Sequence, residues 1–188
     1  MTRFSLAILP LLLAWTVPLT AATITEEEVA IQYNYAEMVA NVGGQEFKLV
    51  LRGNPFGTDP ALLDRAISAL VQKNMPIPTT ITSRPANAAR SPDYRLVLLF
   101  NATAAVPNWW LCDRLDQQAT TPPRADGQIS VSAAYCRNEV ALTSARARTG
   151  AAGLDDPAIN ALFAQLLPVL FPRIDPIRPP LQPRDRTR

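Results

Sequence analysis

The chain has 188 residues, a formal net charge of +2 and no histidine. Without an imidazole, Ser-His-Asp and Cys-His catalysis are excluded, and so is the side chain best suited to proton transfer near neutral pH. A net charge this small does not by itself recruit nucleic acid or an anionic membrane. The glycine-rich patterns that bind nucleotide phosphates are also missing from the sequence, so we expect no cofactor and no nucleic-acid partner.

Residues 1–22 have the pattern of a secretory signal peptide. A single basic residue, Arg3, precedes an apolar run, and small residues follow up to Ala22. The apolar run is shorter than the roughly 20 residues that cross a bilayer, which favours a cleaved signal over a membrane anchor. We therefore expect a mature chain without a membrane span, located in the periplasm or secreted.

The first part of the mature chain carries two conflicting signals. The Thr-Glu-Glu-Glu stretch at residues 25–28 is typical of a helix capping box, yet apolar residues alternate with polar ones directly after it. We favour a strand over residues 29–40, with a helix as the alternative. Two glycines then make a turn into residues 46–52, whose alternation predicts a second strand and therefore a β-hairpin.

A turn-rich segment, residues 53–60 (GNPFGTDP), leads into a helix. Asp59 occupies an N-cap position and Pro60 the first helical position. Apolar residues recur after them at helical spacing, so the sequence predicts an amphipathic helix over residues 60–74 that packs one side on the sheet.

Four later segments are predicted strands. Residues 79–82 are a short candidate, and residues 94–101 (YRLVLLFN) form the most hydrophobic stretch of the mature chain. Such a continuous apolar run is typical of a central strand covered on both faces. Residues 129–137 and 140–148 are most simply an antiparallel pair, with Asn138 at the turn between them.

Cys112 and Cys136 are the only cysteines. Zinc sites need about four ligands, and redox dithiols normally have C-x-x-C spacing, so we expect no metal site and no redox site. In an exported protein the remaining interpretation is a structural disulfide, with two free thiols as the alternative. The bridge would stabilise the fold by about 3.5 kcal/mol in the chain-entropy model. It would attach to the strand face opposite the apolar row of residues 129–135, pinning the segment of Trp109 and Trp110 across that side of the sheet.

The last predicted element repeats the earlier capping pattern. Asp156 and Pro157 open a helix, which we expect Pro168 and Pro172 to stop. Residues 173–188 are rich in proline and arginine and too poor in apolar residues to pack, so we expect an extended or disordered tail. A docking segment is its functional interpretation, and a solvated terminus is the alternative.

The elements together predict one α+β domain over residues 23–172. We expect a mainly antiparallel sheet of about five or six strands, with two amphipathic helices on one face and one disulfide.

Four side chains are candidates for an interaction surface: Arg52, Phe56, Trp109 and Trp110. Phe56 is the aromatic tip of a turn, and two adjacent tryptophans in a strand would point to opposite faces, one buried and one exposed. Each candidate has an ordinary alternative: a redirecting turn for Phe56, a solvated strand face for Arg52, and packing near the disulfide for the tryptophans.

Catalysis by carboxylates alone has little support in the sequence. The clusters available are Glu26 to Glu28, Asp113 with Asp116, and Asp155 with Asp156. The first cluster is interpreted as a polar start to the mature chain, the second as part of a loop and the third as a helix cap. We therefore assign no catalytic residue and expect no enzyme.

The sequence resembles a family of small exported bacterial proteins without assigned function. The resemblance is carried by the signal peptide, by R-G-N-P-F-G at residues 52–57, by residues 94–101, and by L-C at 111–112 with Y-C-R at 135–137. It would cover most of the mature chain, and it implies export but no activity.

We therefore expect a non-catalytic binding or envelope-assembly module whose partner is an envelope protein or a small ligand. One alternative is a carboxylate-dependent hydrolase that acts on an envelope component. The other is an adaptor that docks through its arginine- and proline-rich C-terminal tail.

Overall fold

The computed structural model describes residues 22–86 and 92–173. The predicted signal peptide, apart from Ala22, and the predicted tail, apart from Arg173, lie outside the described residues. No helix within the described part has the length and apolarity needed to cross a membrane.

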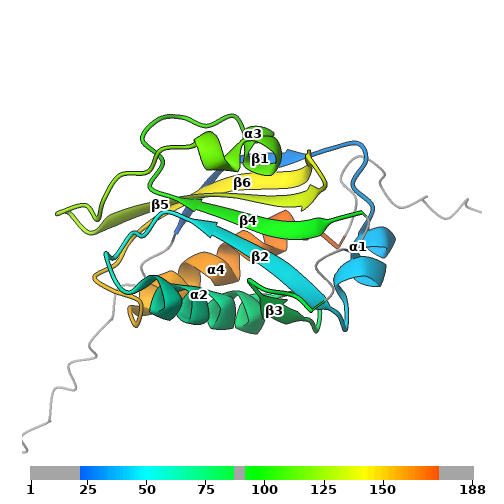
Figure 1. Cartoon of the computed structure of the whole chain (residues 1–188), viewed down its shortest axis with the longest axis horizontal. Helices are drawn as coiled ribbons and strands as arrows, with labels where there is room; N and C mark the ends of the chain where they lie inside the picture. Colours follow the sequence, from blue (N-terminus) through cyan, green and yellow to red (C-terminus); the bar gives the residue numbers. More distant parts are fainter. Residues whose placement is uncertain (1–21, 87–91, 174–188) are drawn as a thin grey trace, which may run out of the picture.

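Six strands form one mixed sheet in the order β1-β6-β5-β4-β2-β3 (Figure 1). Neighbouring strands are antiparallel from β1 through β6 and β5 to β4, whereas β4, β2 and β3 run parallel to one another. The bounds are β1 Thr23–Val29, β2 Glu46–Arg52, β3 Thr80–Thr82, β4 Tyr94–Phe100, β5 Gln128–Arg137 and β6 Val140–Gly150. The predicted α+β class with a mainly antiparallel sheet is confirmed.

Two long helices cover one face of this sheet, as predicted. They are α2, Pro60–Asn74, and α4, Pro157–Leu170, which lie side by side below the strands in Figure 1. Asp59 caps the first, where its Oδ1 accepts hydrogen bonds from two backbone N–H groups, and Asp156 caps the second. The Asp-Pro pairs therefore mark both helix starts correctly.

Pro168 does not stop α4, contrary to the prediction. The helix runs on to Leu170, and the Phe171 N–H still donates to the Leu167 carbonyl over 2.9 Å. A proline removes one hydrogen bond, to the carbonyl four residues earlier. That residue, Ala164, and Pro168 are both exposed, so water can satisfy the carbonyl.

The strand predicted over residues 29–40 is wrong, and so is the hairpin. Strand β1 ends at Val29, and a helix follows, α1, Tyr35–Val42. Asn34 caps this helix by accepting the Glu37 N–H at 3.0 Å, and its apolar residues are buried at a spacing of four. The alternation of apolar and polar residues that favoured a strand falls in the connection between β1 and α1. Strand β1 pairs with β6 at the far edge of the sheet, away from β2.

The main core fills the space between the sheet and the two long helices. Three rings from β2, β5 and the end of α4 meet there: the centroid of Tyr135 lies 5.9 Å from that of Phe47 and 5.2 Å from that of Phe171. Strand β4 is buried along its length, so its prediction as a central strand is confirmed.

The opposite face carries a smaller apolar cluster under the short helix α3, Trp110–Asp113, and the 3₁₀ turn η1, Leu115–Gln117. Cys112 of α3 and Cys136 of β5 form a disulfide, with Cα atoms 5.7 Å apart. Both the bridge and its attachment opposite the main core are confirmed. Trp109 is 54 % exposed and Trp110 half-buried, but they begin a helix instead of lying in a strand.

Candidate functional site

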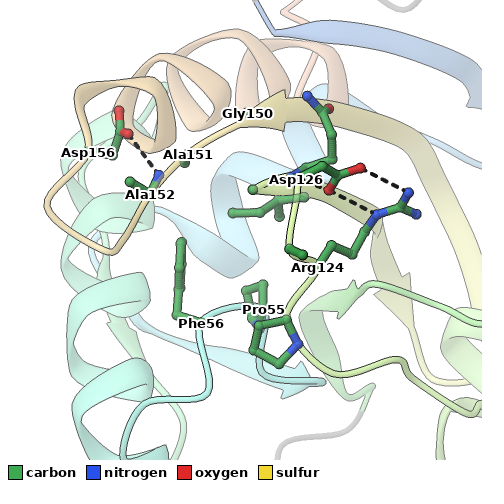
Figure 2. A pocket seen from close by; sticks show the side chains of 13 residues that line it. Pro55, Phe56, Arg124, Asp126, Gly150, Ala151, Ala152 and Asp156 are labelled. Atoms are coloured by element: carbon green, nitrogen blue, oxygen red, sulfur yellow. Dashed lines mark hydrogen bonds and ion pairs between the residues drawn. The ribbon is translucent and has the colours of Figure 1, made fainter.

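A groove lies at the end of the sheet where β2 and β6 finish and β5 begins. Its main cavity has a volume of about 550 Å³. Three segments enclose it, residues 55–56, 123–129 and 150–152, together with the N-cap residue of α4. In Figure 2 the Phe56 ring points toward the segment of Ala151 and Ala152, with Arg124 and Asp126 across from it. Segments distant in the sequence thus share one cavity wall.

The turn that carries Phe56 is fixed by its own polar contacts. The Asn54 side chain donates to the Thr58 carbonyl over 2.6 Å and accepts the Phe56 N–H over 3.3 Å. The turn starts at Gly53, where φ is +85° and a Cβ atom would lie 2.4 Å from the Phe100 carbonyl oxygen. Only glycine fits such a position, so the sequence itself directs the turn across the end of β4.

Both carboxylates of the main cavity are engaged. Asp126 accepts two hydrogen bonds from the Arg124 guanidinium, over 3.3 and 3.2 Å, and one from the Gln128 N–H. The Arg124 hydrogen bonds, followed by that from Gln128, lower the pKa of Asp126. Asp156 accepts the Ala152 and Ala158 N–H groups, which lower its pKa as well. Neither group is thus suited to donate a proton near neutral pH.

A smaller cavity of about 280 Å³ lies at the same end of the sheet but on the α3 face, where Ser130 and Arg148 point. The two share Arg124, Gln128 and Ile129 in their walls, and the smaller one adds Ala102, Ser130 and Arg148. The residue before Ala102, Asn101, fixes this corner: it has φ of 47°, and its side-chain oxygen accepts the Ser130 N–H at 3.0 Å. The smaller cavity is therefore more polar and more basic than the main one.

The structure separates the four predicted interaction residues. Phe56 lines the main cavity and packs against the core on the α2/α4 face. Arg52 does not line it, because its Nε donates to the Gln118 carbonyl over 2.7 Å. Trp109 and Trp110 lie on the α3 side, where the Arg114 guanidinium is 5.6 and 5.4 Å from their ring centroids. Phe56 and the two tryptophans thus form two surfaces on opposite sides of the sheet.

The carboxylate clusters of the sequence do not assemble into a joint site. Asp113 pairs with Arg114, the exposed Asp116 lies 4.0 Å from the Arg52 guanidinium, and Glu26 binds Arg146 over 2.6 Å. Within residues 22–86 and 92–173, no group of three or more His, Cys, Asp or Glu side chains could hold a metal ion.

Arg124, Gln128 and Arg148 were not among the predicted site residues. The local sequence indicates only a turn at residues 124–127. It does not indicate that this turn lies beside β6. The pairing of Ser130 with Arg148 across β5 and β6 brings the smaller cavity together.

The fold and the groove define an α+β protein with a disulfide-anchored sheet face and an open groove at one sheet end. No family model matches the chain, and no curated protein matches it. Among solved structures it is similar to a PelC dodecamer from Paraburkholderia phytofirmans, with 16% identity and a TM-score of 0.39, over 79% of this chain and 97% of that one. A single-residue variant of that dodecamer gives 15% identity and a TM-score of 0.37, over 80% and 98%. Nothing about function follows from likeness this weak.

Proposed function

We propose that this protein is a non-catalytic binding module of the cell envelope, and that the groove beside Phe56 holds its ligand. One observation carries the proposal: a cavity of about 550 Å³ at the sheet end, walled by an aromatic ring, turn backbone and polar side chains. Small-ligand sites are typically cavities of some 300–1,000 Å³ with apolar walls and a few polar groups. The cavity beside Phe56 has this size and composition.

The ionisation of the two carboxyl groups in the groove favours binding over hydrolysis. A glycosidase-type mechanism needs two carboxyl groups across the scissile bond, one of which keeps its proton because its pKa is raised. Asp126 and Asp156 line the main cavity, but the pKa of each is lowered. The carboxylate-dependent hydrolase is therefore the weaker proposal.

An oxidising compartment is supported by the Cys112–Cys136 disulfide. Disulfides form and persist outside the cytoplasm and are rare inside it. Together with the secretory pattern of residues 1–22, this supports the periplasm as the site of action. The same features agree with the family of exported proteins that the sequence resembles.

The groove is tested by fragment binding. The full chain, expressed with its own N-terminal segment, is ¹⁵N-labelled and titrated with a library of small aromatic and polar fragments at millimolar concentration. We expect amide shift changes clustered on residues 123–129 and 150–152. Phe56→Ala should abolish them for aromatic fragments, whereas Leu62→Ala, which removes an exposed side chain of α2, should not. Shifts confined to other surfaces, or none across the library, would contradict the proposal.

An assembly role through the α3 side is the second candidate. Trp109 is 54 % exposed beside Trp110 and Arg114, and large exposed aromatic side chains are enriched at protein interfaces. Affinity capture from the native envelope with the wild type, Trp109→Ala and Phe56→Ala would separate the two surfaces. A partner lost only with Trp109→Ala would favour assembly.

The adaptor alternative rests on the tail. Deletion of residues 173–188 should then abolish capture of the partner while leaving the melting temperature unchanged. Capture that survives this deletion would remove the alternative.

A further inference from the structure

Strand β2 is paired over different stretches on its two sides. On one side β4 pairs with Lys48 to Arg52, whereas on the other β3 pairs only with Glu46 to Lys48 (Figure 1). Among the described residues, no strand continues β3 beside Leu49 to Arg52. The second half of β2 is therefore an open edge in the parallel part of the sheet.

The backbone of β2 directs unpaired polar groups to this open edge. The Thr80 N–H of β3 donates to the Gln45 carbonyl over 3.0 Å. Because successive residues of a strand direct their N–H and C=O groups to opposite sides, the odd-numbered residues that follow Gln45 face the β3 side. At Leu51 both the N–H and the C=O thus face the open edge. Unpaired edge groups of this kind can pair with a further strand.

The other edges of the sheet are protected against such pairing. Strand β1 carries exposed carboxylates at Glu27 and Glu28 and is interrupted by a bulge. On the outer side of β3, the Ile81 N–H donates to the Gln72 side chain of α2 over 3.1 Å. Charges, bulges and covering side chains are the usual means of blocking an edge strand. Residues 49–51 are apolar and pair with β4 without a bulge, so the open edge has none of these devices.

A groove with a volume of about 690 Å³ follows the open edge. It runs between the start of α2, where Pro60 and Leu63 line it, and Thr120 on the other side. Residues 48–51 line it consecutively, so the strand presents its edge and not one face. The groove therefore gives a ligand access to the unpaired backbone of β2.

The chain that follows β3 leaves this groove open. The Ser83 hydroxyl donates to the Asp64 carboxylate of α2 over 2.8 Å, which fixes the chain where β3 ends. The Ala86 N–H then donates to the Glu46 carboxylate over 2.6 Å. Since Glu46 is the first residue of β2, the chain turns back toward the start of the strand instead of continuing along its edge.

We propose that the open edge of β2 binds an extended segment of a partner polypeptide, which adds to the sheet as a short strand in line with β3. In strand addition, main-chain hydrogen bonds supply affinity, and pockets for alternate side chains supply selectivity. The occupant continues the pairing that β3 already makes with the same edge. It is a polypeptide because the unpaired groups of Leu51 match another backbone.

The walls of the groove define the side chains of this segment. The groove contains one cation, Lys48, and one anion, Asp64, so its charge does not select an ionic partner. Leu49, Leu51 and Leu63 form its wall on the α2/α4 side, which favours apolar residues at alternate positions. Residues 174–188 of the same chain are poorly suited, because four of them are prolines, which have no N–H to donate.

This site is distinct from the cavity beside Phe56, with which it shares no lining residue. The inference therefore goes beyond the proposed function. Either can fail while the other stands, because fragments report on residues 123–129 and a strand-forming peptide reports on residues 48–54.

The probe is the capped peptide Lys-Thr-Val-Thr-Val-Thr-Lys, titrated into the ¹⁵N-labelled full chain up to millimolar concentration. In the free protein, the amide hydrogen of Leu51 should exchange faster than that of Val50, which faces β4. We expect the peptide to shift the amide resonances of residues 48–54 and to slow the exchange at Leu51.

Two matched pairs test whether the backbone carries the binding. Leu51→Pro removes the outward N–H without removing a bond to β4, whereas Leu51→Ala shortens the side chain and keeps the N–H. The proline variant should bind the peptide about fivefold more weakly than the alanine variant, since one hydrogen bond is lost. In the second pair, N-methyl groups block one edge of the peptide or the other, and only one of these two peptides should lose binding.

The N-methylated peptides decide the question on the wild-type chain if Leu51→Pro does not fold, which far-UV circular dichroism checks. Absence of shifts at residues 48–54, or equal binding of the two N-methylated peptides, would overturn the proposal, because its recognition is through the backbone. Self-association of the wild type that Leu51→Pro abolishes would assign the edge to a second copy of this chain and would overturn the partner segment as well.

Discussion

The two faces of the sheet are held by different physical means. On the α2/α4 face, two long helices bury a continuous apolar core with aromatic rings in contact. On the α3 face, a helix of four residues and the segments around it cover a much smaller apolar cluster. The first face is stabilised by burial, which scales with the apolar area removed from water. The second has too little such area and depends on a cross-link and polar bonds.

Four bonds of the α3 face fasten the segment of residues 106–112 to strands of the sheet. The disulfide joins Cys112 to β5, and Arg95 of β4 donates to the Cys112 carbonyl over 2.7 Å. Arg146 of β6 donates to the Val106 carbonyl, and Asn108 donates to the Glu26 carbonyl of β1. Four strands thus hold this segment at three residues, Val106, Asn108 and Cys112.

The largest effect is expected from the core of the α2/α4 face. Phe47→Ala removes a fully buried ring that contacts Tyr135 and Phe171, and it should lower the free energy of unfolding by about 3–5 kcal/mol. Guanidinium-induced unfolding measures the loss. Leu62→Ala, on the exposed side of α2, should cost much less, and equal losses would mean that burial does not dominate this face.

The disulfide is expected to have the next largest effect. Replacing both Cys112 and Cys136 by serine should lower the free energy of unfolding by about 3.5 kcal/mol, because the unfolded chain regains the entropy of a loop with a sequence separation of 24. The loss should also be local. Beyond residues 1–22, Trp109 and Trp110 are the only tryptophans, so their fluorescence reports on the segment next to α3.

Tryptophan fluorescence distinguishes a disulfide that stabilises only the α3 face from one that stabilises the whole fold. In the double serine variant we expect the emission of the tryptophans to change at denaturant concentrations below the main transition followed by far-UV circular dichroism. Wild-type protein treated with a reducing agent serves as the control and should behave in the same way. Coincident transitions in both samples would contradict a locally anchored α3 face.

Arg146 tests the polar bonds of the same face. Arg146→Gln removes the donors to Glu26, Ser132 and the Val106 carbonyl, and it should cost about 1–3 kcal/mol because Ser132 and Val106 are buried and lose their partner. Arg148→Gln is the matched control, since it changes the same residue type on the same strand and face but at an exposed position. Similar unfolding midpoints for the two variants would contradict the structural role of Arg146.

The same contrast explains which parts of the fold could be predicted from the sequence. The helices of the apolar face could be predicted from their Asp-Pro caps and their stripes of apolar residues. The buried strand β4 could be predicted from its continuous hydrophobic run. The disulfide followed from elimination. These signals are local or depend on composition, so they do not require knowledge of the strand order.

The missed elements depend on contacts that are distant in the sequence. Residues 29–35 alternate as a strand would, but the chain then enters a helix in which Met38 and Val42 are buried in the core as one stripe. Of the groove, Phe56 was predicted because an aromatic tip in a turn is visible locally. Arg148 of the smaller cavity was not predicted, because its place beside Ser130 and Arg124 is set by the pairing of β5 with β6.

The smallest effect is expected from Glu37 of α1, a polar contact on the apolar side of the sheet. Its Oε1 accepts the Tyr94 hydroxyl at 2.6 Å and the Arg137 guanidinium at 2.8 Å. The hydrogen bond from Tyr94, followed by the contacts of Arg137, holds the pKa of Glu37 below its ordinary value of 4.5, against the opposing effect of burial. A carboxyl whose pKa is lowered by folding stabilises the protein above its unfolded pKa and loses this contribution as the pH falls through its folded pKa.

Glu37→Gln should therefore cost less than about 1 kcal/mol at pH 7, as is usual for a partly exposed ion pair, and the difference from wild type should shrink as the pH falls below 4.5. Unfolding of the two proteins between pH 7 and pH 3 measures it, with the exposed Glu139→Gln as the control. A pH-independent difference would mean that packing and not charge links α1 to the sheet. A loss larger than that of Arg146→Gln would reverse the comparison of the faces, because polar contacts would then contribute more where apolar burial is greatest.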